Sequence, residues 1–187
     1  VAGNVGIYYE MPPYTALGFK DKEGNFVNRE LKYQRVASGS VGVNWRPSTR
    51  IILSMEGFYK RYTDMPLSVL DNIPLACKGN DYGIFGNEAL VSTAQGRAYG
   101  VELLAKWQVP DRINASASLT LYQSEYRNDK HSPYLPSAWD NHYILNMSCI
   151  WSLPRKWDLG AKLSVIGGSP YTPFDEEKSS LVEAWNA

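Results

Sequence analysis

Few residues in this chain are placed to do covalent chemistry. His131 and His142 are its two histidines, and no cysteines or histidines have the spacing of a metal site. On a strand, Asp140 and His142 would share a face and could hold a metal, but we expect a hydrogen-bonded pair at a strand's outer rim. The sequence therefore predicts no catalytic residue, no enzyme activity, no metal site and no cofactor.

Charged side chains recur at alternate positions of several stretches and so project to one side. Glu56 and Glu102 project to this side at similar depth, which would suit an acid/base pair. A ladder of ion pairs with neighbouring basic side chains, filling a wet interior, is the reading that we favour. The predicted lumen-facing polar network consists of Arg46, Glu56, Lys60, Glu102, Lys106, Tyr122 and Lys162.

Aromatic side chains are frequent in the long polar segments between these stretches. Exposed aromatic rings offer stacking surfaces for sugars or chelates. The alternative is that the rings pack the loops against each other. The candidate ligand-contacting aromatics are Tyr14, Tyr82, Phe85, Tyr126, Tyr134 and Tyr171.

The elements that must position these residues alternate apolar and polar side chains. From 113 to 121 every odd-numbered residue is apolar and no position breaks the alternation. This period of two is typical of strands with one apolar face. The pattern predicts about seven strands, within 1–10, 37–46, 51–61, 99–108, 113–124, 143–152 and 157–165.

The connections between these strands are alternately short and long. Tight turns are expected at 47–50, 109–112 and 154–156, and long polar segments at 12–33, 64–95, 126–140 and 169–187. Compact soluble domains rarely contain several such loops, whereas outer-membrane barrels have short periplasmic turns and long outer loops. Tryptophans beside the short turns fit an aromatic girdle. The sequence thus predicts an all-β, antiparallel up-and-down transmembrane β-barrel.

Composition limits the remaining classes. The 187 residues carry 19 basic and 19 acidic side chains, so no basic surface points to a nucleic-acid partner. No run of about 18 apolar residues predicts a membrane-spanning helix. Cys77 falls in a long loop and Cys149 on an apolar strand face, so we expect two free thiols. The chain starts within a strand and shows no signal peptide, which suggests a piece of a longer protein.

Two other classes are open at this stage. A soluble extracellular β-sandwich acting as a carbohydrate-binding module would fit the aromatic loops and the mean hydropathy of −0.35. Its strands would be shorter than those expected here. A small closed barrel of the outer membrane, acting as an adhesin or enzyme, would need an even number of strands.

Five sequence blocks occur in the order found in one family. The chain resembles the C-terminal barrel half of TonB-dependent outer-membrane receptors, especially the type found in Bacteroidetes. The blocks are YYEMPPY at 8–14, GFYKRY at 57–62, RAYGVELL at 97–104, WDNH at 139–142 and GGSPYTP at 167–173.

This resemblance implies a 22-stranded barrel closed by an N-terminal plug. Residues 1–187 would form a partial barrel domain of about seven strands, without the plug and the final strands. Such receptors sit in the bacterial cell outer membrane and import iron chelates, cobalamin or oligosaccharides with energy passed through TonB. The implied partners are outer-membrane lipid, the imported solute, TonB through the missing N-terminal region and, as a further candidate, a surface lipoprotein.

Overall fold

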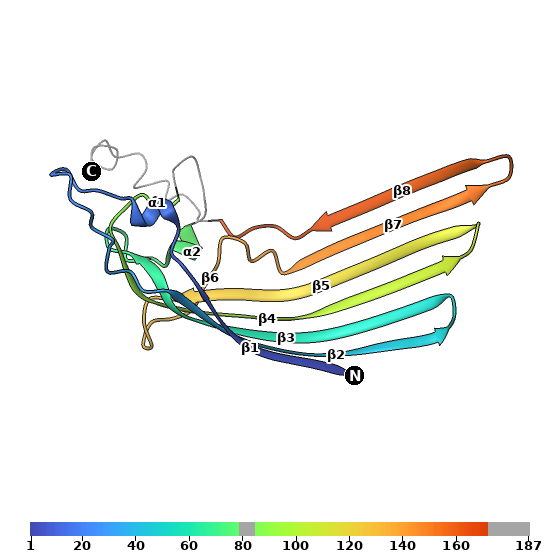
Figure 1. Ribbon diagram of the computed structural model, residues 1–187, viewed down its shortest axis with the longest axis horizontal. Helices are drawn as coiled ribbons and strands as arrows, with labels where there is room; N and C mark the ends of the chain where they lie inside the picture. Colours follow the sequence, from blue (N-terminus) through green and yellow to red (C-terminus); the bar gives the residue numbers. More distant parts are fainter. Residues whose placement is uncertain (79–84, 172–187) are drawn as a thin grey trace, which may run out of the picture.

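The computed structural model describes residues 1–78 and 85–171. Its strands form one antiparallel sheet in the order β1-β2-β3-β4-β5-β7-β8, with the short β6 paired to β5 (Figure 1). Each long strand therefore lies beside the next long strand in the chain. The expected up-and-down arrangement of seven long strands is confirmed. The strands are β1 (Ala2–Glu10), β2 (Gln34–Ser48), β3 (Ile51–Ser68), β4 (Leu90–Val109), β5 (Ile113–Arg127), β6 (Leu135–Pro136), β7 (Tyr143–Leu153) and β8 (Trp157–Ile166).

The strand register divides the sheet into two chemically different faces. Leu103 of β4 lies opposite Met55 of β3 and Leu119 of β5, within a row of apolar residues. One position along, Glu102 lies opposite Glu56 and Thr120. Because side chains alternate along a strand, these rows lie on opposite sides of the sheet. We call the side of the odd-numbered residues the apolar face and the side of the even-numbered residues the polar face.

The apolar face is uncovered. The side chains of Leu103, Leu121 and Leu163 keep 38%, 48% and 52% of their area exposed. In the part of the chain that the structure describes, there is one sheet and no second layer over these residues. A sandwich buries the inner faces of two sheets against each other. The β-sandwich alternative is therefore wrong.

The three short turns fall where the sequence predicts them. Two residues join β2 to β3, and three residues each join β4 to β5 and β7 to β8. Asp111, Arg155 and Lys156 have φ values of 55°, 69° and 61°, in the left-handed region used by tight turns. All three turns lie at the same end of the sheet, on the right in Figure 1.

At the opposite end the strands are longer than predicted. Strand β3 continues to Ser68, and β4 begins at Leu90. The predicted strands stop near Arg61 and Tyr99 because the outward positions beyond the tyrosines are charged, so apolar and polar residues no longer alternate. The connection expected over 64–95 is accordingly reduced to 69–89.

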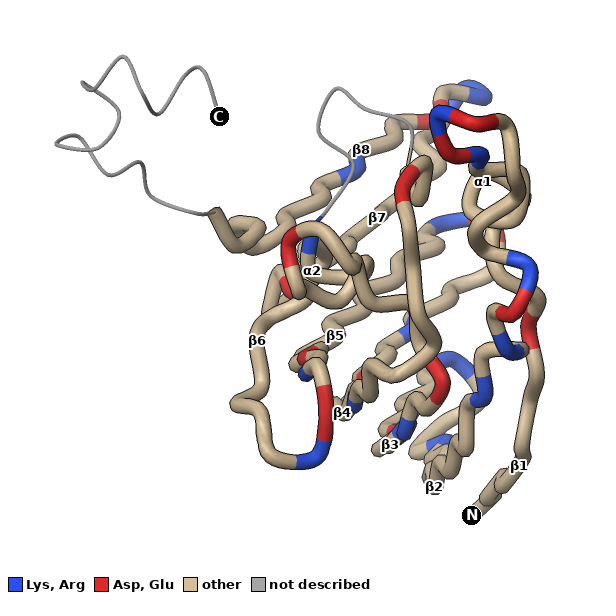
Figure 2. Tube along the Cα trace, turned by 90° about the vertical axis from the view of Figure 1, so that its left-hand side faces the viewer, with Lys and Arg blue, Asp and Glu red and all other residues tan. Residues whose placement is uncertain are grey.

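The long connections and two helices, α1 (Tyr14–Leu17) and α2 (Leu75–Lys78), pack together at this end. Figure 2 shows both helices on one side of the curved sheet. We call this assembly the loop layer; its described residues are 11–33, 69–78, 85–89 and 128–142. Its core consists of Ala16 and Leu75 with Leu90 of β4, and Leu31 and Phe85 pack against them. No helix among the described residues is long and apolar enough to cross a membrane.

Candidate functional site: a polar sheet face closed by loops

The predicted polar network lies along the polar face. Glu56 is directly opposite Glu102, Lys106 is opposite Ser116, and Lys162 is opposite Ser148. Tyr122 lies opposite Gly100, and Lys60 opposite Ala98. Arg46 falls between Trp45 and Ser48, where the register shifts. The common face of these residues fits the prediction, and their contact with a lumen stays a prediction.

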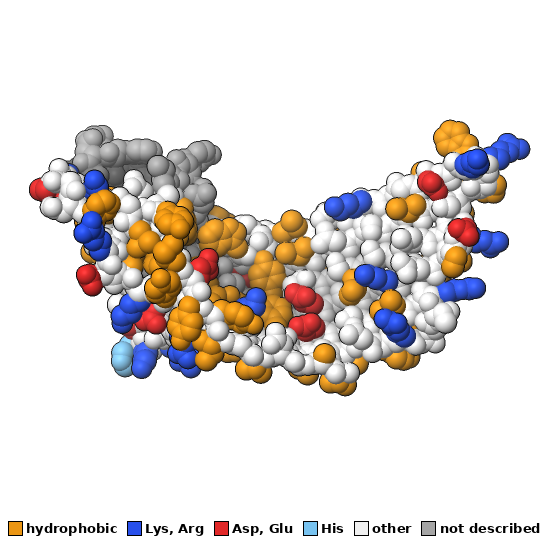
Figure 3. All heavy atoms as spheres, in the orientation of Figure 1, with side chains coloured by type: hydrophobic (Ala, Val, Ile, Leu, Met, Phe, Trp, Pro, Cys, Tyr) orange, Lys and Arg blue, Asp and Glu red, His pale blue; other side chains and the backbone are white. Residues whose placement is uncertain are grey.

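The expected ladder of ion pairs is absent from the described residues: no ion pair within 4.0 Å joins members of this network. The reason is the spacing. Lys60 is four residues from Glu56, and Lys106 is four residues from Glu102, which is about 13 Å along a strand. The two carboxylates instead lie directly opposite each other on adjacent strands, where like charges repel, and both residues are exposed. Figure 3 shows charged side chains spread along the strands and hydrophobic ones gathered near the loop end.

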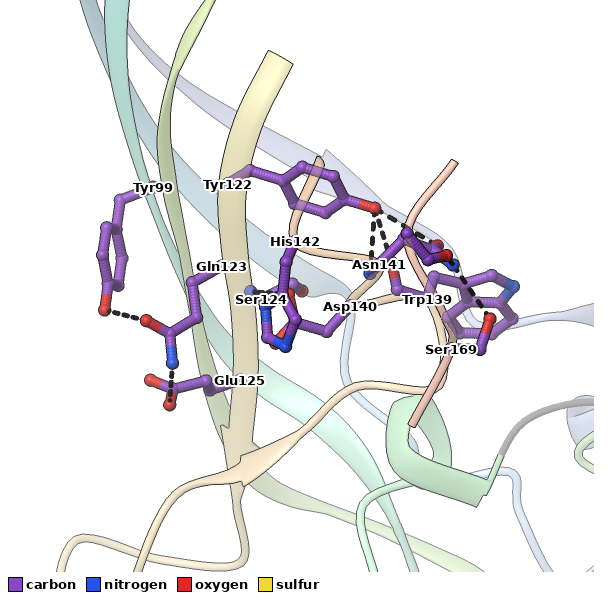
Figure 4. Close-up of polar contacts among 11 residues, drawn as sticks. Tyr99, Tyr122, Gln123, Ser124, Glu125, Trp139, Asp140, Asn141, His142 and Ser169 are labelled. Atoms are coloured by element: carbon purple, nitrogen blue, oxygen red, sulfur yellow. Dashed lines mark hydrogen bonds and ion pairs between the residues drawn. The ribbon is translucent and has the colours of Figure 1, made fainter. Parts of the chain in front are cut away.

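The loop layer covers one end of this polar face. The Tyr122 hydroxyl donates a hydrogen bond to the Trp139 carbonyl oxygen over 2.7 Å (Figure 4). The buried Tyr126, also on the polar face of β5, packs against Tyr62 with ring centroids 5.5 Å apart. The Ser92 hydroxyl accepts a hydrogen bond from the Lys32 amide over 3.0 Å. The loops therefore fold over the polar face, and on the apolar face they leave the leucine rows bare and reach only the arginines of the loop end, where Tyr134 packs on Arg97 and Arg127.

Asn28 holds the loop layer together. Its amide nitrogen donates to the carbonyl oxygens of Ala16 and Glu88 over 2.8 and 2.7 Å. Its amide oxygen accepts from the Leu90 backbone N–H over 2.9 Å. With 1% of its area exposed, Asn28 joins two loops to strand β4 from a fully buried position. Sequence reasoning missed this residue because an asparagine in a polar segment also fits an exposed turn.

An ionic cluster fixes the connection 69–89 beside this core. The Lys78 ammonium donates to Glu88 Oε1 over 2.7 Å and also contacts Asp71. The Ser68 hydroxyl donates to the other Glu88 carboxylate oxygen. Burial acts to lower the pKa of Lys78, but the bonds to Asp71 and Glu88 outweigh it, and the net shift is upward. The lysine thus stays charged and joins α2 to Asp71 and Glu88, near the two ends of the connection 69–89.

The WDNH block joins β5 to the segment that follows β8. The Asn141 side-chain amide donates to the Gly167 carbonyl oxygen and to the Ser169 hydroxyl, both over 2.9 Å. Its backbone N–H donates to the Tyr122 hydroxyl over 3.3 Å (Figure 4). A Cβ atom on Gly167 would lie 1.8 Å from the Asn141 carbonyl oxygen. The close approach of the segment after β8 to the WDNH block therefore requires glycine at position 167.

Asp140 and His142 lie close together, but the expected hydrogen bond between them is absent, and both residues precede β7 and do not lie on a strand. The His142 Nδ1 is 3.6 Å from Asp140 Oδ1, which accepts a hydrogen bond from the Ser124 N–H over 3.1 Å. Asp140 is fully buried, whereas His142 is exposed. Within 1–78 and 85–171, no group of three or more side chains could hold a metal ion.

Tyr14 and Tyr171 are the most exposed of the predicted ligand-contacting aromatics. Tyr134 is half-buried, and the guanidinium groups of Arg97 and Arg127 lie 4.0 and 4.8 Å from its ring centroid. These three tyrosines lie at the loop end. Their contact with a ligand stays a prediction.

The other three aromatics are placed differently. Phe85 packs on the loop core and lies edge-on to Trp139, with ring centroids 6.2 Å apart. The expected loop position of Tyr126 is wrong: it lies on β5 and is buried. Phe85 and Tyr126 therefore follow the alternative in which aromatic rings pack the loops together. Tyr82 lies outside the described residues.

Comparison with known proteins identifies the family. The family model described as TonB dependent receptor-like, beta-barrel, matches residues 2–179. The fold is similar to that of the FrpB iron transporter from Neisseria meningitidis (F3-3 variant), with a TM-score of 0.50 and 14% sequence identity over 71% of this chain. The chain spans 19% of the length of that transporter. No curated protein matches it. An antiparallel sheet with one bare apolar face and a family match over nearly its whole length show that the chain belongs to the β-barrel domain of the TonB-dependent receptor family.

Proposed function

We propose that this chain is part of an outer-membrane transporter that imports a scarce solute, namely an iron chelate, cobalamin or an oligosaccharide. The barrel would have 22 strands and be closed by an N-terminal plug. TonB would supply the energy through an N-terminal region outside this chain. The five sequence blocks support the Bacteroidetes type, and a surface lipoprotein is a candidate partner.

The observation that carries this proposal is the position of the loop layer. The loops pack on the polar face, through contacts such as that of Tyr122 with Trp139, and the leucine rows of the opposite face are bare. In a barrel with hydrocarbon outside, the polar face lines the lumen and the loop layer lies over its outer mouth. A solute arriving from outside would meet the loop layer first.

The exposed aromatics of the loop end support capture of a ligand with flat or ring-shaped parts. Tyr14 and Tyr171 are the most exposed, and Trp139 is also exposed. Aromatic rings of this kind stack on sugars and on chelate ligands. The structural neighbour is described as an iron transporter, so ferric chelates are the first ligands to test.

The test is uptake by cells that produce the full-length receptor, with and without TonB. Labelled ferric chelates, cobalamin and oligosaccharides are offered in turn. We expect one class to bind in both strains and to enter the cell only when TonB is present. Uptake of every class at the rate of cells without the receptor would contradict the proposal.

Two variants separate capture from folding. Replacing Tyr14 and Tyr171 by alanine removes exposed rings and should weaken ligand binding at an unchanged level of folded receptor. The matched control is Tyr33→Ala, which removes a third exposed tyrosine from a position outside the candidate set. Equal weakening in the control would remove the assignment of Tyr14 and Tyr171 to the ligand site.

A further inference from the structure

The apolar face changes character at the loop end. Tyr59 and Tyr99 stack there with ring centroids 6.4 Å apart. Two positions further along each strand lie Arg61 and Arg97, directly opposite one another. Arg35, on neighbouring β2, projects from the same face two positions beyond Ala37, the partner of Arg61. We call Arg35, Arg61 and Arg97 the arginine row.

The arginine row carries more positive charge than nearby acids neutralise. Glu125 pairs with Arg97, with an N–O distance of 2.8 Å. Within the described ranges, no carboxylate lies within 4.0 Å of the Arg61 or Arg35 guanidinium, and both arginines are exposed. Both the Nε and one Nη of Arg97 lie 2.8 Å from Glu125 Oε2, so the unbalanced positive charge is that of Arg61 and Arg35. An anion bound beside Arg61 would neutralise its charge.

The position of the row indicates which anion is available. Trp107 at the short-turn end and Tyr99 at the loop end are eight residues apart on β4, about 26 Å along the strand. This length matches the apolar band of an outer-membrane barrel, about 25 Å tall between aromatic girdles. Arg61 and Arg97 begin about 7 Å beyond the tyrosines. At that depth the surroundings of the barrel wall are lipid headgroups.

We propose that the arginine row binds the phosphate group of an outer-leaflet lipid. Arg61 would contact the phosphate through paired hydrogen bonds, and Arg97, whose Nε and one Nη already bond Glu125, would add an N–H donor from its remaining Nη on the facing strand. The Arg97 guanidinium is packed over the Tyr134 ring at 4.0 Å, which orients it before the lipid arrives. The stacked Tyr59 and Tyr99 rings lie directly below, where they would contact the sugar or glycerol of the headgroup. This site lies on the membrane-facing side of the barrel wall and is separate from the residues proposed to capture the solute.

The test measures lipid bound to the purified full-length receptor without imported solute or TonB. The probes are lipid A with its phosphates and the same lipid after removal of the phosphates, each presented in mixed micelles. We expect the phosphorylated lipid to bind and Arg61→Gln/Arg97→Gln to weaken that binding about 25-fold, or about fivefold per arginine. The matched control is Arg50→Gln/Arg112→Gln, which removes the same charge at the short-turn end and should leave binding unchanged.

Three results would overturn this site. They are equal binding of the dephosphorylated lipid, equal weakening in the Arg50/Arg112 control, and occupation by inorganic phosphate with the affinity of the lipid. Arg61→Lys gives a further check, because a lysine retains the charge but loses the paired hydrogen bonds, and its binding should lie between those of wild type and Arg61→Gln. Solute uptake is assayed separately, so failure of the transport proposal is distinguishable from failure of this site.

Discussion

The strands and the loop layer are stabilised in opposite ways. Along the strands, leucines such as Leu103 and Leu121 are exposed, and the buried hydrophobic residues of the described chain lie toward the loop end. The loop layer has its own small core around Ala16 and Leu75 and a buried Asn28 whose hydrogen bonds are made. The loop layer thus follows the rules of proteins in water, and the strands follow those of proteins in a bilayer.

The difference teaches that the surrounding medium decides which residues need a partner. In water, an exposed apolar surface as large as that of the strands marks an interaction site. In a membrane the same surface contacts lipid. The interior of the loop layer contacts neither lipid nor bulk water, so each buried polar group there needs its own hydrogen-bond partner.

The largest effect is expected at the centre of the apolar face. Replacing Leu103 by arginine places a charge at the middle of the lipid-facing wall and should destabilise the folded receptor by about 2–4 kcal/mol. The matched control is Leu104→Arg on the same strand, whose side chain projects to the polar face, where water can accommodate it. The measurement is urea unfolding of the receptor in vesicles. Equal costs for both variants would erase the distinction between the two faces.

The next effect belongs to the loop layer. Asn28→Ala removes three hydrogen bonds and leaves buried groups without partners, which should cost about 2–3 kcal/mol locally. Hydrogen exchange of the Leu90 amide, which bonds to Asn28, should become about a hundredfold faster. Asn25→Ala is the control, because Asn25 is exposed and its side chain bonds only to Asp21. Unchanged exchange in Asn28→Ala would show that the core holds the loops without this residue.

A smaller loss is expected where the loop layer meets the end of β8. Gly167→Ala forces the backbone away from Asn141 and should cost about 1–3 kcal/mol. Gly168 supplies the control, since an added Cβ there would meet no atom within 4 Å. The thermal midpoints of the two variants measure the difference. If Gly167→Ala were as stable as Gly168→Ala, the backbone at position 167 could shift away from Asn141 without cost, and the prediction would be wrong.

The smallest effect is a change in reactivity. Burial raises the pKa of the Cys77 thiol to about 11, from an ordinary value of 9.0. The thiol is therefore neutral below about pH 9, and its contribution to the loop layer's stability is lost as the pH rises toward 11. In a Cys149→Ser background, iodoacetamide should label Cys77 slowly at pH 8 and much faster after Asn28→Ala opens the loops. Labelling at the rate of a free thiol in the unaltered loops would contradict the burial of Cys77.

Much of the strand region follows from the sequence. The alternation from Ile113 to Leu121 and the short turns predict the sheet order and which side chains share a face. The added lengths of β3 and β4 were missed because charged residues such as Arg61 and Arg97 interrupt the alternation. The ladder of ion pairs was wrong because shared parity does not bring residues four positions apart into contact.

The loop layer is less predictable because its contacts join residues far apart in the chain. Asn28 reaches Leu90 across 62 positions, and no local pattern marks such a contact. The sequence predicts a loop position for Tyr126 because this residue follows the last clearly alternating residues of its strand. Its burial depends on Tyr62 and on Gly96, where a Cβ would lie 2.4 Å from the Tyr126 ring.

The most direct test of the account is a scan of positions 101–106 of β4 with a spin label in the full-length receptor, reconstituted in vesicles. Collisions with oxygen, which concentrates in lipid, are compared with collisions with a water-soluble nickel complex. The account predicts maximal oxygen contact at 101, 103 and 105 and minimal contact at 102, 104 and 106. A profile without alternation, or one with its maxima at the even positions, would contradict the assignment of the apolar face to hydrocarbon.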